Sequence, residues 1–97
     1  MKNDHPLVSI ILVNYNTSFL TLECIKSIFS SNYQTFKIIV VDNNSTLEDY
    51  NRITKTVNAL NWDLLLFRNK MNTGFASACN IGIDLAIQNR SEFVLLL

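Results

Sequence analysis

Asp42 is the residue whose type and position point most directly to chemistry in this sequence. It ends the apolar run Phe36–Val41, and the polar segment Asn43–Thr46 follows it. A run of apolar and β-branched residues is typical of a strand that is covered on both faces. A carboxylate at the end of such a strand could accept hydrogen bonds from the N–H of a uracil or thymine ring, or from two ribose hydroxyls. We interpret Asp42 as a ligand-binding carboxylate, with the capping of a turn as the alternative.

Two further polar clusters also follow apolar runs. Tyr15 comes just after the run Leu7–Val13 and offers an aromatic face for a base. The segment Arg68–Gly74 follows the run Trp62–Phe67 and carries two positive charges ahead of a predicted helix. The free amides and the dipole at the start of that helix favour an anion such as a diphosphate. Each feature also has a structural alternative: a packed aromatic ring, two solvated cations and a glycine that the turn requires.

These clusters can meet only if the elements between them form a parallel sheet. Hydrophobic periodicity predicts strands at 7–13, 36–41, 62–67 and 92–97, and helices at 18–31, 46–60 and 75–89. This alternation predicts an α/β fold with three layers and a doubly wound, mostly parallel sheet. Because the carboxyl ends of parallel strands share one edge, we expect the three clusters at that edge, at a topological switch point.

Local patterns add detail to the predicted helices. Ser45 and Glu48 have the spacing of a capping box, so the second helix is expected to begin at about Thr46. Its apolar stripe would be Leu47, Tyr50, Ile53, Val57 and Leu60, and its water-facing side Asp49, Arg52 and Lys55. The inward face of the third helix would be Phe75, Ala78, Cys79, Gly82, Leu85 and Ala86. A helical glycine costs about 1 kcal/mol relative to alanine, so Gly82 indicates a close approach to another backbone.

Composition excludes several classes of protein. The 97 residues carry eight basic and eight acidic side chains, so no surplus of positive charge is available for the phosphates of a nucleic acid. Hydrophobic residues make up 48% of the chain, which is typical of a folded domain with one core. We predict neither a signal peptide nor a transmembrane helix. Cys24 and Cys79 match no metal-ligand pattern and are expected to be buried, reduced thiols, which fits a cytoplasmic protein.

Two common folds lack their key residues here. A dinucleotide-binding fold needs G-x-G-x-x-G after its first strand, where this sequence reads NYNTSF. A receiver-type phosphorylation domain needs acids at the ends of the first and third strands, where Asn14 and Asn69 stand. Neither fold is therefore predicted.

Three segments, VSIILVNYN, IIVVDNNST and NTGFASACNIGI, occur in this order along the chain. Together they resemble the family 2 glycosyltransferases of the GT-A fold, particularly bacterial rhamnosyltransferase-like members. The resemblance implies that residues 7–97, after a flexible N-terminus at 1–6, form the Rossmann-like, nucleotide-sugar-binding part of such a fold, incomplete after the fourth strand. It implies a UDP- or dTDP-sugar as ligand. The residues it implies for nucleotide binding are Val13, Tyr15, Asp42, Asn44, Arg68, Asn72, Gly74 and Asn80.

The resemblance also implies where the reaction would take place. In the family, the strand that matches Glu92–Leu97 is followed by an acidic D-x-D-like motif that holds a divalent metal, Mn²⁺ or Mg²⁺, and later by a general base. Both would lie beyond Leu97, so we expect no catalytic residue and no bound metal within this chain, and no turnover by it alone. The implied parent is an inverting glycosyltransferase with a glycan or lipid-linked acceptor, in bacterial surface polysaccharide synthesis at the inner face of the membrane.

Two other readings remain open, a non-enzymatic nucleotide-binding module and, more weakly, a structural or interaction domain. The chain ends in the apolar run FVLLL, which indicates a truncated sequence. A fourth strand at this place would leave an apolar edge, and we expect two copies of the chain to associate through it.

Overall fold

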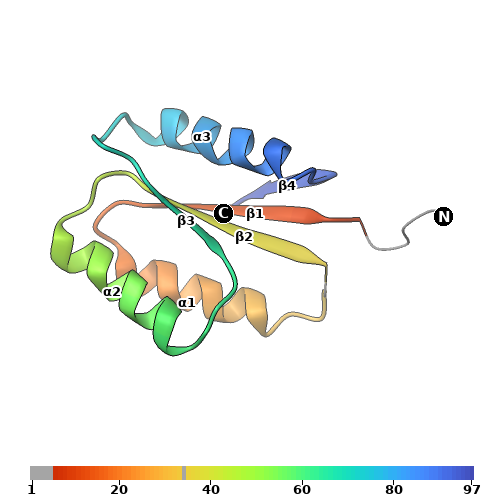
Figure 1. The fold of residues 1–97 in the computed structure, drawn as a ribbon, viewed down its shortest axis with the longest axis horizontal. Coiled ribbons are helices and arrows are strands. Elements are labelled where there is room, and N and C mark those ends of the chain that lie inside the picture. The colour runs from red at the N-terminus through yellow and green to blue at the C-terminus, as the bar shows by residue number, and fades with distance from the viewer. Residues whose placement is uncertain (1–5, 34) are drawn as a thin grey trace.

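A single four-stranded sheet forms the centre of the molecule. The computed structural model describes residues 6–33 and 35–97. The elements are β1 (Val8–Asn14), α1 (Ser18–Phe29), β2 (Phe36–Asp42), α2 (Leu47–Ala59), β3 (Leu65–Arg68), α3 (Phe75–Gln88) and β4 (Phe93–Leu96). All strand pairs are parallel and the order is β3-β2-β1-β4. In Figure 1, α1 and α2 cover one face of the sheet and α3 covers the other. The prediction of a three-layer, doubly wound α/β fold is therefore confirmed.

The side chains of the central strands alternate between two separate core clusters. Ile10 and Leu12 of β1, with Ile38 and Val40 of β2, pack with the helix residues Ile25 and Ile28 on the α1 side. The odd-numbered residues Ile11, Ile39 and Val41 pack with Ala78 and Ala86 of α3 on the other side. Successive strand residues point to opposite faces. Even-numbered residues of β1 and β2 therefore face α1 and α2, whereas odd-numbered residues face α3.

Three strands end in register at one edge of the sheet. Asn14 of β1 pairs with Asp42 of β2, and Asp42 pairs with Arg68 of β3. The backbone pairing continues one step into the loops, since Asn43 N donates to Asn14 O at 2.8 Å and Asn69 N donates to Asp42 O at 2.8 Å. The polar segments after these strands therefore converge, as the sequence predicts. The order of the strands reverses beside β1, where β4 joins the sheet on the side opposite β2.

The predicted start of the third strand is wrong by three residues. Trp62, Asp63 and Leu64 precede β3, which begins at Leu65. Asn61 has a positive φ of 53°, and Trp62 N donates to Val57 O, so this segment still belongs to the turn after α2. The Trp62 ring packs against Phe29 at a centroid distance of 5.6 Å. The apolar residues of this segment therefore pack against the core without forming part of the strand.

The predicted capping box of α2 is also wrong. Thr46 is the N-cap residue, and its side chain accepts from Asp49 N at 3.3 Å. Ser45 Oγ instead donates to Asp42 Oδ1 at 2.7 Å. Asp49 is buried rather than facing water, and Leu47 at one end of the expected stripe is exposed. The first turn of α2 therefore faces another way than the apolar stripe predicts, because a polar network fixes this end of the helix.

Gly82 of α3 marks a close contact, although the partner is not a backbone. A Cβ added at this position would lie 2.5 Å from Cγ2 of Ile11 on β1. The missing side chain therefore lets α3 lie close to the sheet. Phe75, at the start of the same helix, was expected to face inward but is 65% exposed. Cys79 is buried and Cys24 is half-buried, and both are free thiols. No helix in the described part of the chain is long and apolar enough to cross a membrane.

Candidate functional site

A buried hydrogen-bond network joins the ends of β1 and β2 on the face that α1 and α2 cover. Asn14 Nδ2 donates to Asp42 Oδ1 at 2.9 Å and to Asp49 Oδ2 at 3.0 Å. Ser45 Oγ accepts from the same nitrogen at 3.1 Å, and Ser45 N donates to Asp42 Oδ2 at 3.0 Å. Asn14 and Asp42 are both fully buried. A buried network whose members are all paired is rigid, because each unpaired group would lose its hydration without compensation.

Arg68 provides a further hydrogen bond to Asp42. Its guanidinium donates to Asp42 Oδ2 at 2.6 Å and to Ser45 O at 2.8 Å. A third bond, of 3.2 Å, goes to the Asn44 side-chain oxygen. The same guanidinium lies 4.5 Å from the centre of the Tyr50 ring. Both oxygens of Asp42 are thus used by protein donors, and Arg68 is directed at the protein rather than at solvent.

Asp49 supplies the cap that α1 does not make for itself. The N-cap residue Thr17 makes no side-chain bond to the helix, because its hydroxyl donates to Asn14 Oδ1 at 3.2 Å. Asp49 Oδ1, on α2, accepts from Ser18 N at 3.0 Å. Arg52 Nη1 lies 3.6 Å from the same oxygen and donates to Ser18 Oγ at 2.8 Å. A carboxylate from one helix therefore stabilises the first amide of another.

The charge of Asp49 is favoured by these neighbours. Burial by itself would raise the pKa of this carboxyl group, because desolvation disfavours the charged form. The bonds from Ser18 and Asn14, together with the positive charge of Arg52, outweigh burial and lower the pKa below its ordinary value. Asp49 is therefore an acceptor at neutral pH, as its two bonds require.

An open cavity of about 370 Å³ lies at the same edge but on the α3 face of the sheet. The residues that line it are Val13, Tyr15, Thr17, Asn43, Asn72, Gly74 and Phe75. They come from the end of β1, the loop after it, the loop after β2 and the start of α3. The cavity combines two aromatic rings, one aliphatic side chain and several polar groups. This composition suits a ligand with one flat, partly apolar moiety and polar substituents.

Asn43 organises one wall of this cavity. Its amide nitrogen donates to Asn72 Oδ1 at 2.9 Å and to Gly74 O at 3.2 Å. Its oxygen accepts from Asn69 Nδ2 at 3.1 Å and from Thr73 N at 3.3 Å. One nearly buried side chain thus fixes the whole loop between β3 and α3.

The start of α3 borders the cavity with its backbone. Gly74 is the N-cap residue, with φ of 88°, and gives the helix no side-chain cap. The combination of a φ of 88° with a ψ of 163° is adopted almost only by glycine, so this turn depends on the missing side chain. Nothing lies within 4 Å of a Cβ added at Gly74, so space remains beside it. The first amides of α3 border that space, which suits a negatively charged group.

The structure divides the predicted nucleotide-binding residues into three groups. Val13, Tyr15, Asn72 and Gly74 line the cavity. A second group lies away from the cavity, on the face of the sheet that α1 and α2 cover, where Arg68 donates hydrogen bonds to Asp42 and Asn44. Asn80 is exposed on α3 and does not line the cavity. Asn44 has φ of 68°, and its amide donates to Lys70 O at 3.1 Å, so it shapes the turn.

Sequence reasoning missed Thr17, Asn43 and Phe75 as lining residues, and Asp49 as a buried member of the network. The signal for Asn43 was available in the alternation of the strand. Val41 and Asn43 face α3, whereas Asp42 faces α1 and α2. A ligand on the α3 side therefore meets the residue after the acid rather than the acid itself.

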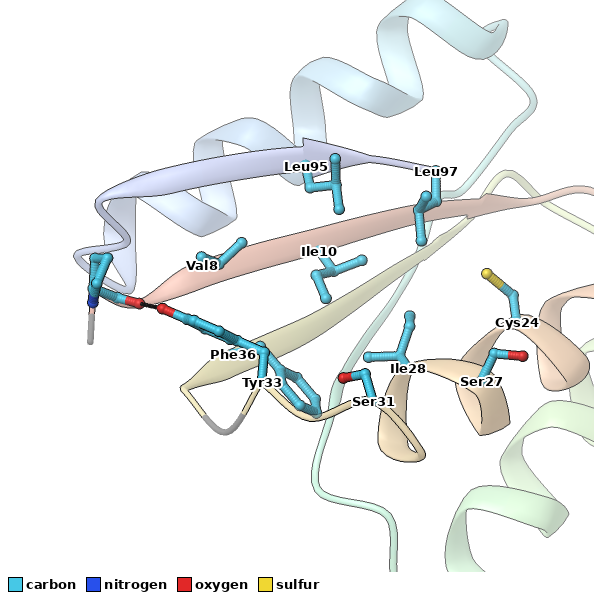
Figure 2. Close-up of a pocket in the computed structure, with 11 residues that line it drawn as sticks. Val8, Ile10, Cys24, Ser27, Ile28, Ser31, Tyr33, Phe36, Leu95 and Leu97 are labelled. Atoms are coloured by element: carbon cyan, nitrogen blue, oxygen red, sulfur yellow. Dashed lines mark hydrogen bonds between the residues drawn. The ribbon is translucent and has the colours of Figure 1, made fainter. Parts of the chain in front are cut away.

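A larger cavity, of about 600 Å³, lies away from this edge (Figure 2). It is a groove between α1 and the strands β1 and β4. Figure 2 shows Val8, Ile10, Ile28, Leu95 and Leu97 around it, with Tyr33 bonded to the carbonyl of Pro6 at its end. Its lining is almost entirely apolar and offers few groups that could orient a polar ligand.

No group of three or more His, Cys, Asp or Glu residues within 6–33 and 35–97 is placed to hold a metal ion. Asp42 and Asp49 are the two buried carboxylates at the polar edge, and their oxygens already accept from protein donors. Glu48, in the first turn of α2, is the exposed carboxylate beside them and lies 3.7 Å from Arg52 Nη2. One exposed carboxylate does not make a ligand set, so the described residues do not fit a divalent metal.

Comparison with known proteins identifies the family. Residues 9–97 match glycosyl transferase family 2, so the chain belongs to this family. Its α/β layers are those of a GT-A glycosyltransferase. A glycosyltransferase of Haemophilus influenzae without an assigned activity is 33% identical over 84 residues. The Escherichia coli protein WcaA, named as a glycosyl transferase of colanic acid biosynthesis, is 33% identical over 87 residues. These matches cover 80% and 89% of this chain but only 24% and 30% of the two relatives.

Two solved structures show the same arrangement. The mannosyltransferase PcManGT from Pyrobaculum calidifontis, in complex with GDP-Man and Mn²⁺, has a TM-score of 0.68 and 28% identity, over 84% of this chain and 25% of that protein. GalNAc-T7 with UDP, GalNAc and Mn²⁺ has a TM-score of 0.72 over 88% of this chain and 16% of that protein. At 22% identity, the second comparison shows a shared fold alone.

Proposed function

We propose that this chain is the part of a glycosyltransferase that binds the nucleotide of a nucleotide-diphosphate sugar. The observation that carries the proposal is the cavity on the α3 face, which is lined both by Tyr15 and by the start of α3, where no side chain caps the helix. An aromatic ring and a helix N-terminus are suited to a base and a diphosphate respectively. Family membership and the neighbour that binds GDP-Man support the same ligand class.

The lining residues suggest separate roles. Tyr15 and Val13 would contact the base, and the backbone at Gly74 and Phe75 would contact the diphosphate. Asp42 and Arg68 would position the loops around the nucleotide without touching it, because their polar atoms are bonded to each other and to Ser45. We expect a UDP- or dTDP-sugar, with GDP-sugars as the class to compare.

The whole enzyme would transfer the sugar with inversion to a glycan or lipid-linked acceptor in polysaccharide synthesis, as the likeness to WcaA suggests. Metal binding and the general base would belong to parts of the enzyme outside residues 1–97. Neither buried carboxylate at the polar edge, Asp42 or Asp49, is free for either task. We therefore expect the 97-residue chain to bind nucleotide and to release no sugar from a donor in the presence of Mn²⁺ and acceptor.

Calorimetric titration of the chain with UDP, dTDP and GDP tests this proposal. Tyr15→Ala should weaken binding about tenfold, because stacking of a base on an aromatic ring contributes roughly 1–3 kcal/mol. Tyr33→Ala is the matched control, since Tyr33 borders the apolar groove instead. Absence of binding to all three nucleotides would refute the proposal. Equal weakening by both substitutions would place the ligand elsewhere.

A non-enzymatic nucleotide-binding module is the second candidate. The observation in its favour is that both buried carboxylates at the polar edge, Asp42 and Asp49, accept hydrogen bonds from protein donors. Both candidates predict that this chain binds a nucleotide, and they differ in whether the full-length protein transfers a sugar. Transfer of sugar by the full-length protein would exclude the module.

A further inference from the structure

We propose that Asp49 is a positioning residue for the nucleotide cavity and acts through the loop Tyr15–Thr17. Asp49 does not line the cavity, and it lies on the opposite face of the sheet. The inference rests on the proposed function only for the identity of the ligand. The effect on the loop can be measured without any ligand.

The loop is anchored to the segment 45–49 at several points. Asn16, in its centre, has a positive φ of 54°, which asparagine adopts more readily than most residues. Asn16 N donates to Ser45 Oγ at 2.9 Å, and Asn16 Oδ1 accepts from Thr46 N at 2.9 Å. These bonds hold the middle of the loop against the start of α2. They leave the two ends of the loop to be fixed by other contacts.

Asp49 fixes both of those ends with one side chain. Its Oδ2 accepts from Asn14, the residue before the loop, and its Oδ1 accepts from Ser18 N, the residue after it. The two residues it joins are four apart in sequence and enclose the whole loop. The carboxylate therefore sets the distance and angle between the end of β1 and the start of α1.

Tyr15 and Thr17 are the two members of this loop that line the cavity. Tyr15 is 47% exposed and makes no side-chain hydrogen bond within the described residues, so its position follows from its backbone. A ligand stacked on Tyr15 would therefore sense the loss of Asp49. The Thr17 hydroxyl would move with it, because its partner Asn14 is itself bonded to Asp49.

Two substitutions separate the contacts that Asp49 makes. Asp49→Ala removes both acceptors. Asp49→Asn keeps one acceptor oxygen for Ser18 N but presents an N–H group toward Asn14. Glu48→Gln is the matched control, since Glu48 is the neighbouring acid on α2 and its side chain is 87% exposed. All three would be titrated with UDP in trimethylamine oxide, an osmolyte that favours the folded state.

We expect Asp49→Ala to weaken UDP binding by the folded chain about tenfold, because part of the binding free energy must then re-order a loop that Asp49 no longer holds. Asp49→Asn should weaken it less, and Glu48→Gln should leave it unchanged. In spectra of the free proteins, the amide signals of residues 15–17, none of which bonds Asp49 through its own amide, should shift in both Asp49 variants and not in the control. These shifts separate displacement of the loop from a general loss of stability.

Each outcome decides the inference. Unaltered amide signals at residues 15–17 in folded Asp49→Ala would overturn it, whether or not UDP binds. Unaltered UDP affinity in that variant, with wild-type binding intact, would also overturn it and leave the proposed function standing. If the wild-type chain binds no nucleotide, the proposed function fails, and the amide signals alone judge the positioning of the loop.

Discussion

Two cavities of this molecule flank β1 and differ in what surrounds them. The cavity on the α3 face is the smaller of the two, and it combines the rings of Tyr15 and Phe75 with a polar wall that the side chain of Asn43 holds by hydrogen bonds. The groove in Figure 2 is larger, almost wholly apolar, and lies beside the edge strand β4. Volume therefore does not locate the site. Convergent polar groups orient a ligand, whereas an apolar groove offers only surface that neighbouring side chains leave uncovered.

The largest loss of stability is expected when Asp42 is removed from the polar network beside the cavity on the α3 face. Asp42→Ala should lower the free energy of unfolding by about 3 kcal/mol, because Arg68 and Asn14 then lose a buried acceptor. Denaturant titration measures the change. Asp63→Ala, at an exposed acid ahead of β3, should stay within about 0.5 kcal/mol of the wild type. If both variants unfold at the same denaturant concentration, the network does not hold the edge together.

A smaller effect is expected from acid, through Asp49. The pKa of Asp49 is lowered in the folded chain from the ordinary 3.8, so the ionised side chain stabilises the fold above that value. This contribution should be lost as the pH falls below 3.8 and through the lowered folded-state pKa. The difference in unfolding free energy between the wild type and Asp49→Asn should therefore shrink from neutral pH to pH about 2.

The neighbouring acid provides the control for this pH dependence. Glu48→Gln should differ little from the wild type across the same range, because the Glu48 side chain is 87% exposed and screened by solvent. A difference between the wild type and Asp49→Asn that stays constant with pH would mean that the charge of Asp49 contributes nothing to the fold.

The layers of the fold and the convergence of the polar segments follow from the sequence because both depend on repeating patterns. Runs such as Phe36–Val41 predict buried parallel strands, and parallel strands bring their carboxyl ends to one edge. Tyr15 and Gly74 could be placed at this edge for that reason. The assignment to the glycosyltransferases came from the family resemblance, because periodicity alone does not indicate an activity.

The details that failed, such as the water-facing position expected for Asp49, depend on contacts that are distant in sequence. The face on which Asp42 lies follows from the alternation of β2, and its role as a ligand-binding carboxylate stays a prediction. The burial of Asp49 could not be predicted in this way, because its partners Asn14 and Ser18 lie more than thirty residues away. Asp49 shares its helix side with Arg52, so helical periodicity assigns both to solvent. Only the packing of α2 beside α1 turns this carboxylate into a cap for the other helix.

The edge strand β4 lies beside the apolar groove, and substitutions there are expected to change stability least. Side chains of β4 are 40–60% exposed, and its outer edge pairs with no strand in the described residues. Such an edge presents free backbone amides and carbonyls, which another copy of β4 could satisfy in an antiparallel pair. We expect light scattering at high concentration to give a mass above the 11.1 kDa of one chain.

Leu95→Lys should return that mass to 11.1 kDa, because a charge on an edge strand opposes pairing with a second copy. Leu20→Lys is the control, since Leu20 is an exposed leucine on α1, remote from β4. Both substitutions should change the unfolding free energy of the monomer by only about 0.5 kcal/mol, as for most exposed positions. A monomeric wild type would show that an apolar edge is insufficient for association. A loss of association in both variants would assign it to exposed leucines in general rather than to β4.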